Sequence, residues 1–72
     1  MDTLQIEAEV GQQVGLVNRR DAAYVACFVG PDGRDGQVTA ARFVQANAAA
    51  NILSALGIQA VRIWSNLTHD WT

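Results

Sequence analysis

A chain of 72 residues has room for a single domain, and we expect residues 1–72 to form it. Half of the residues are hydrophobic, which excludes a disordered tail, and the net charge of −2 disfavours a nucleic-acid-binding protein. The lone cysteine, Cys27, excludes an internal disulfide, so we expect self-association or a bound partner to support so small a core.

The first segment, residues 3–10 (TLQIEAEV), alternates strictly between polar and apolar side chains. A period of two over this length predicts a half-buried strand. Glu7 and Glu9 would then project together from its solvent-facing side and could meet a cationic partner. After a glycine bend, residues 14–18 (VGLVN) are a second, shorter candidate strand.

A β-hairpin is predicted next. Residues 22–30 (AAYVACFVG) are apolar on both faces, as expected for a central strand. Residues 30–36 (GPDGRDG) combine proline, aspartate and glycine, which is a turn composition, and residues 37–39 (QVT) follow as the returning strand.

A helix is predicted from about residue 40 to residue 56, with Thr39 as its N-cap and Gly57 ending it. A helical wheel divides its residues into a side that packs on the sheet and an outer side. The packing side comprises Ala41, Val44, Ala48, Ile52, Ala55 and Leu56, and the outer side comprises Phe43, Ala46, Asn47, Ala50 and Ser54, with Leu53 at the margin.

The outer side of this helix lies in a segment, residues 43–61, that has no ionisable side chain. The high helix propensity of alanine alone accounts for such a composition. Alternatively, a flat face of small residues receives another helix or a partner, with Phe43 as the anchor beside Ala46 and Ala50. The sequence leaves both interpretations open.

Residues 58–64 (IQAVRIW) predict a closing strand, with Val61 and Ile63 facing inward and Arg62 and Trp64 outward, although the opposite register also fits. Residues 65–72 are expected to form a loosely held tail. The predicted fold is therefore α+β in two layers, an antiparallel sheet of three to five strands with one helix on one face.

A single helix covers only one face of a sheet, so the other face needs a different cover. The N-terminal segment, the tail with Trp71 and a second molecule are the three candidates, and a homodimer or an obligate protein partner is the prediction that we draw. The candidate partner-binding residues are Glu7, Glu9, Phe43, Ala46, Ala50, Trp64 and Trp71.

Motifs of common chemistry are not found. The chain has no lysine, which excludes a phosphate-binding P-loop, and Asp32 and Asp35 lack the spacing of an EF-hand. Cys27 lies in an apolar strand and His69 in the tail, so no nucleophile–base pair is indicated. We therefore expect no catalytic residue, no metal ligand and no cofactor, and we predict that the protein is not an enzyme.

The start of the chain, MDTLQIEAEV, lacks the basic and apolar regions of an export signal. A free thiol fits the reducing cytoplasm, and the glutamines and asparagines of residues 43–61 are too polar for a membrane span. We expect a cytoplasmic protein without membrane contact.

Residues 22–66 (AAYVACFVGPDGRDGQVTAARFVQANAAANILSALGIQAVRIWSN) resemble small phage-encoded anti-CRISPR proteins in element order and composition: a hairpin, an alanine-rich helix and a closing strand. The resemblance implies a non-enzymatic inhibitor that binds a host nuclease or CRISPR effector subunit in the host cytoplasm. It also implies that acidic side chains, here Asp2, Glu7 and Glu9, cover a cationic site of the target.

A nucleic-acid-associated domain is the alternative. The hairpin followed by an alanine-rich helix is similar to the C-terminal half of a double-stranded-RNA-binding domain, and the sheet and helix are also similar to small antitoxins. Double-stranded-RNA-binding domains contact phosphates through clustered lysine and arginine side chains, whereas this chain has no lysine and only five arginines.

Overall fold

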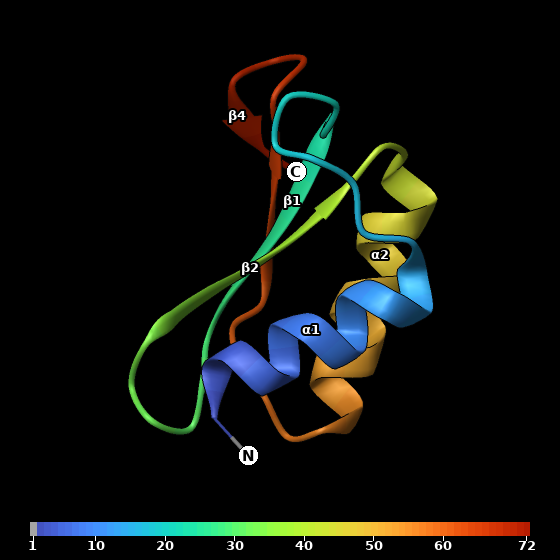
Figure 1. Cartoon of the computed structure of the whole chain (residues 1–72). Coiled ribbons are helices and arrows are strands. Elements are labelled where there is room, and N and C mark those ends of the chain that lie inside the picture. The colour runs from blue at the N-terminus through green and yellow to red at the C-terminus, as the bar shows by residue number, and fades with distance from the viewer. Residues whose placement is uncertain (1) are drawn as a thin grey trace.

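The computed structural model describes residues 2–72 as two layers, a four-stranded antiparallel sheet and a pair of helices (Figure 1). The strand order across the sheet is β2-β1-β3-β4. Both helices pack on the same face, which confirms an α+β fold but corrects the predicted number of helices from one to two. The elements in chain order are α1 (Thr3–Val14), β1 (Tyr24–Val29), β2 (Asp35–Ala40), α2 (Phe43–Ala55), β3 (Arg62–Ser65) and β4 (Asp70–Trp71).

The first element is a helix, so the strand prediction for residues 3–10 is wrong. Asp2 caps α1 in a capping box, because its carboxylate accepts from the backbone N–H of Gln5 while the side-chain oxygen of Gln5 accepts from that of Asp2. Ile6 and Val10 are buried at the i, i+4 spacing of a helix. The expected second strand is also absent from residues 14–18, since the helix runs to Val14 and the rest is a loop.

The start of α1 is tied to the turn between β1 and β2. The hydroxyl of Thr3 donates to the carboxylate of Asp32, and the backbone N–H of Arg34 donates to the same oxygen at 3.3 Å. The hydroxyl of Thr3 is the main reason that the pKa of the Asp32 carboxyl lies below its ordinary value of 3.8. Asp32 therefore stabilises the hairpin turn and also holds the start of α1 against it.

This anchor predicts a pH-dependent effect of Asp32→Asn. Since the folded pKa is lowered, the ionised carboxylate stabilises the fold above about pH 3.8, and that stabilisation is lost as the pH falls through the lowered folded value. We expect Asp32→Asn to unfold at lower urea concentration than the wild type at pH 7, with the two midpoints converging in strong acid. A difference that persists undiminished to the lowest pH would contradict the role of the charge.

The predicted hairpin is confirmed, and its second strand is longer than residues 37–39. The strands β1 and β2 pair from Tyr24 opposite Ala40 to Val29 opposite Asp35. Gly33 in the connecting turn has φ +81°, a conformation that glycine adopts without steric cost.

The helix predicted at residues 40–56 is present as α2, but the side assigned to the sheet is wrong. Leu53 and the outer-side residue Ala46 have no exposed surface, whereas Leu56 from the predicted packing side is 50% exposed. Thr39 is not the N-cap, because it lies in β2 and Arg42 takes that position. The helix has no charged side chain, and its neutral polar residues Asn47, Asn51 and Ser54 are a weaker guide to its exposed side. Packing against α1 and the strands therefore decided which side is buried.

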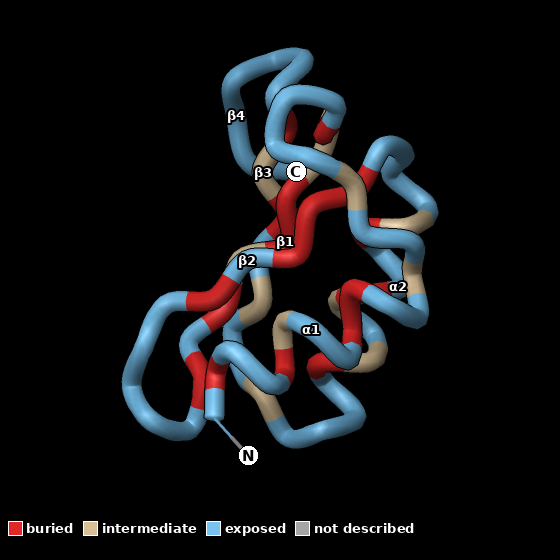
Figure 2. The backbone as a smooth tube through the Cα atoms, in the orientation of Figure 1, coloured by how far each residue is buried: buried red, intermediate tan, exposed pale blue. Residues whose placement is uncertain are grey.

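The core lies between the sheet and the two helices (Figure 2). Its main cluster joins α1, α2 and the central hairpin: Ile6, Val10, Ala26, Phe28, Val38, Ala49 and Leu53. A smaller cluster of Ala40, Ala46 and Ile63 continues it along the sheet, with Tyr24 packed against it. All of these side chains lie on one side of the sheet, so its opposite side has no helix over it.

The closing strand predicted at residues 58–64 is present as β3, but it begins only at Arg62 and runs to Ser65. Ile63 is buried and Arg62 and Trp64 lie on the outer side, which is the first of the two registers left open by the sequence. The segment expected to be a tail contains a turn and the short strand β4, in which Trp71 pairs with Trp64 and Asp70 with Ser65. Neither helix of residues 2–72 has the length and apolarity needed to cross a bilayer.

Candidate functional site

We call the surface of the sheet opposite the helices the open face. Because side chains alternate along a strand, the register places one set of side chains from all four strands there. They form three rows across the sheet: Thr39, Val25, Trp64 and Trp71 in the first, Gln37, Cys27 and Arg62 in the second, and Asp35 and Val29 in the third.

An aromatic and cationic corner occupies one side of the open face. The rings of Trp64 and Trp71 meet edge to face with centroids 5.1 Å apart, and the guanidinium carbon of Arg62 lies 4.0 Å from the centroid of the Trp71 ring. Both contacts are attractive, through the ring quadrupole. They hold the short strand β4 against β3 while leaving Trp71 41% exposed.

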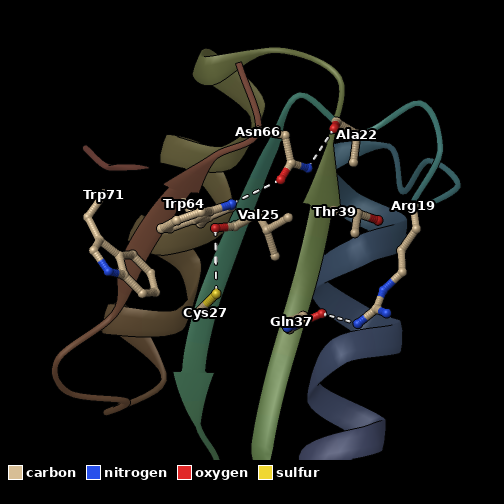
Figure 3. A pocket seen from close by; sticks show the side chains of 9 residues that line it. All are labelled: Arg19, Ala22, Val25, Cys27, Gln37, Thr39, Trp64, Asn66 and Trp71. Carbon is tan, nitrogen blue, oxygen red and sulfur yellow. Dashed lines mark hydrogen bonds between the residues drawn. The ribbon is translucent and has the colours of Figure 1, made fainter. Parts of the chain in front are cut away.

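Hydrogen bonds fix Trp64 within this corner. Its indole N–H donates to the side-chain oxygen of Asn66 at 3.0 Å, and the side-chain nitrogen of Asn66 donates to the carbonyl of Ala22 at 2.9 Å (Figure 3). The turn after β3 is thereby joined to the loop before β1. A ring held from two sides loses little rotamer entropy when a ligand packs on it.

The loop between α1 and β1 borders the opposite side of the open face. Arg19 in this loop donates from Nη2 to the side-chain oxygen of Gln37 at 2.8 Å, and the hydroxyl of Thr39 donates to the carbonyl of Val17 at 2.6 Å. These bonds place a second guanidinium beside the sheet, across from the tryptophan corner (Figure 3).

Two adjoining depressions, of about 430 and 450 Å³, hollow the open face. Cys27, Gln37 and Trp71 line both of them, so they form one continuous surface. Arg19 and Trp64 line only the first depression, and Arg62 and Asp35 line only the second.

Cys27 lies at the centre of this surface and is partly buried. Desolvation by burial raises the pKa of its thiol above the ordinary value; Arg62 opposes this shift and Asp35 adds to it. The thiol is therefore protonated at neutral pH, and a protonated thiol is a weak nucleophile. Cys27 contributes a small apolar group to the floor of the face.

The open face differs in charge from the rest of the molecule. Two arginines and one aspartate line the two depressions, which gives them a net charge of +1. The remaining three arginines and six acidic residues carry −3, which together make the −2 of the whole chain. The face is thus a weakly cationic region on an acidic protein.

The sheet offers a partner its face rather than its edges. At the β2 edge, the backbone N–H of Gln37 donates to the carboxylate of Glu7 at 2.9 Å. The loop before β1 covers the same edge through the bond from Thr39 to Val17. At the other edge β4 has only two residues. Covered and short edges are the usual protection against strand addition.

The structure brings together only two of the seven predicted partner-binding residues, Trp64 and Trp71. Glu7 and Glu9 do not share a side, because two residues advance by about 200° around a helix. Glu7 is engaged with β2, whereas Glu9 is exposed.

The other three predicted residues belong to α2. Phe43 packs edge to face on Tyr24 with ring centroids 5.5 Å apart, although part of it stays exposed. Ala46 is completely buried and Ala50 packs against the smaller core cluster. Ala46 therefore has no surface with which to contact a partner.

Sequence reasoning missed Arg19, Gln37 and Cys27 as members of the site. The signal for Cys27 was present, because apolar residues on both faces of β1 indicated that something other than the helix meets the second face. Arg19 comes from an irregular loop, and no periodicity places such a residue.

Residues 2–72 hold no group of three histidine, cysteine or acidic side chains arranged to bind a metal ion. No protein-family model matches the chain, and no curated protein and no solved structure matches it either. The geometry of the open face is therefore the basis for the proposals that follow.

Proposed function

We propose that this protein is a non-enzymatic binding module that engages a protein partner through the open face of its sheet. One observation carries the proposal: both helices pack on the same side of the sheet, and the other side presents the exposed Trp71 against the ring of Trp64, which a hydrogen bond to Asn66 holds in place. Tryptophan and arginine are the residues that most often dominate interface energy, and here Trp71 and Arg62 are in contact.

The size of the molecule is compatible with this role. A stable protein–protein contact buries about 800 Å² on each partner, which is roughly a sixth of the 4609 Å² accessible surface of this chain. Val29, on the third row and 55% exposed, extends the apolar surface away from the tryptophan corner. The exposed side chains of the open face, Arg62, Trp71 and Val29 among them, would form the centre of such a contact.

We further propose that the module acts as an inhibitor of a host defence complex, as anti-CRISPR proteins do. The order hairpin, alanine-rich helix, closing strand, on which that resemblance was based, is the order of β1, β2, α2 and β3. The carboxylate of Glu7 already accepts a hydrogen bond from the backbone N–H of Gln37. We therefore propose that the target contacts the open face and not the acidic residues of the N-terminal segment. Restored phage plaquing on a CRISPR-immune bacterium that expresses the chain would support this role, and unchanged immunity would count against it.

Trp71→Glu tests the binding surface. A carboxylate in place of the indole removes the apolar contact, so we expect partner capture from the native host to be lost. Leu67→Glu is the matched control, because Leu67 is exposed on the neighbouring turn and lines neither depression. We expect it to retain capture at the wild-type level, measured by quantitative mass spectrometry of the eluates.

Trp71→Glu also removes the contacts of β4, so its circular dichroism and thermal midpoint must be compared with the wild type. Val29→Glu is a second variant that leaves β4 intact and places a charge on the same face. Capture that survives both Trp71→Glu and Val29→Glu would eliminate the open face as the binding surface.

A second candidate function is the binding of single-stranded nucleic acid. The observation that favours it is the exposed Trp71 ring with Arg62 against it, since bases stack on aromatic and guanidinium groups. Phosphate attraction by the whole chain is weak, because the net charge is negative. Protein binding is therefore the function that the structure supports best.

A further inference from the structure

The charge of the open face defines the chemistry of its partner. We infer that the partner segment is acidic and apolar, with a carboxylate that pairs with Arg62 and a large apolar side chain that packs on Trp71 and Trp64. This inference rests on the proposed function and adds the chemical class of the partner to it.

Arg62 is positioned for such a pair. Within residues 2–72 its guanidinium contacts the Trp71 ring, with no carboxylate of the chain paired to it. Its neighbour across the strand pair is Cys27, a small neutral group that leaves space beside it. Arginine presents a planar fork of N–H donors that matches a carboxylate, and stacking on the ring keeps that fork in a restricted orientation.

The distribution of charge favours an acidic partner over a basic one. The face carries +1 while the remainder carries −3, so an acidic segment is attracted to this side and repelled by the others. Arg19 adds a second cation across the face. Asp35 lies in the third row, so we place the carboxylate of the partner toward the tryptophan corner, away from it.

The scarcity of free cations on the open face favours a peptide over a nucleic acid. The partly buried Cys27 and the buried Val25 lie between the two arginines, and one of these, Arg19, already donates to Gln37. A nucleic-acid site clusters several free cations along a phosphate backbone. Here an aliphatic or aromatic side chain with a neighbouring carboxylate uses more of the surface.

A displayed library of short random peptides, selected on the full chain, tests this inference. We expect the retained sequences to be enriched in aspartate or glutamate next to aromatic or aliphatic residues. Arg62→Gln is expected to weaken the binding of a selected peptide about tenfold, as measured by fluorescence anisotropy, since it removes one charge-assisted hydrogen-bonded pair. Arg20→Gln is the matched control, because it changes the net charge equally at an exposed loop position that lines neither depression.

The outcomes separate this inference from the proposed function. Selected peptides that bind Trp71→Glu as tightly as the wild type would overturn the proposed function itself. Peptides that need Trp71 but are neutral or basic, or that bind Arg62→Gln as tightly as the wild type, would overturn only the acidic partner. Tighter binding of an oligothymidine than of any selected peptide, with the same need for Arg62, would assign the face to single-stranded nucleic acid instead.

Discussion

Replacing Leu53 by alanine is expected to lower the free energy of unfolding by about 2–5 kcal/mol, the range for truncation of a fully buried leucine. Leu53 has no exposed surface and joins α2 to Ile6 and Val10 of α1 and to the central hairpin. A domain of this size has a total stability of roughly 4–11 kcal/mol, so the loss is a large share of it. Urea unfolding followed by tryptophan fluorescence measures the change.

Leu56→Ala is the control for this prediction. Leu56 lies three residues further along the same segment, but half of its surface is exposed, so we expect a cost of about 1 kcal/mol or less. The two variants test which side of α2 is buried, because the helical wheel had assigned Leu56 to the side on the sheet and Leu53 to the margin. A larger loss of stability for Leu56→Ala than for Leu53→Ala would mean that the side chosen by the wheel faces the sheet, and would contradict the burial of Leu53.

Gly36→Ala is the second substitution with a large expected effect. Gly36 pairs with Phe28 across the hairpin, and the Phe28 ring lies over it. A Cβ at position 36 would lie 2.7 Å from Cε1 and 2.8 Å from Cε2 of that ring, and closer still to Cζ. Because Phe28 is buried in the main cluster and cannot swing into solvent, we expect a loss of about 1–3 kcal/mol. Thermal unfolding measures it.

A double-mutant cycle identifies the cause of that loss. Phe28→Leu shortens the side chain above Gly36 and costs stability by itself, since it leaves a gap in the core. If the clash is the cause, Gly36→Ala costs less in the Phe28→Leu background than in the wild type. Equal costs in both backgrounds would place the effect in the strand backbone instead of the aromatic contact.

The parts of the fold that depend on neighbouring residues could be predicted from the sequence. The hairpin of β1 and β2 follows from a turn of proline, aspartate and glycine between apolar runs, and α2 follows from its alanine content and from Gly57 at its end. The outward direction of Arg62 and Trp64 was one of the two registers that the sequence left open, and the structure selects it. A local signal for α1 was present and missed: Asp2 followed three residues later by Gln5 is a capping box.

Alternation misled the prediction at α1 because Ile6 and Val10 satisfy two periods at once. Residues four apart lie on one side of a strand and also on one side of a helix. Leu4 and Ala8, which a strand would place on the same side as Ile6 and Val10, decide between the two periods, and both are exposed in the structure. Their exposure is a consequence of packing against β2 and α2, which the segment itself does not encode.

The sequence by itself determined where the chain turns and where the alanine-rich helix lies, because these features depend on contacts a few residues apart, but it left two registers open for β3. Only the tertiary structure decided that α1 and α2 share one side of the sheet, which side of α2 is buried, and that Arg19 meets Gln37 across from the tryptophans. A helix without charged side chains carries only a weak local signature of its buried side, and a surface built from four strands and a loop carries none. Their arrangement is set by which packing excludes the most apolar surface from water.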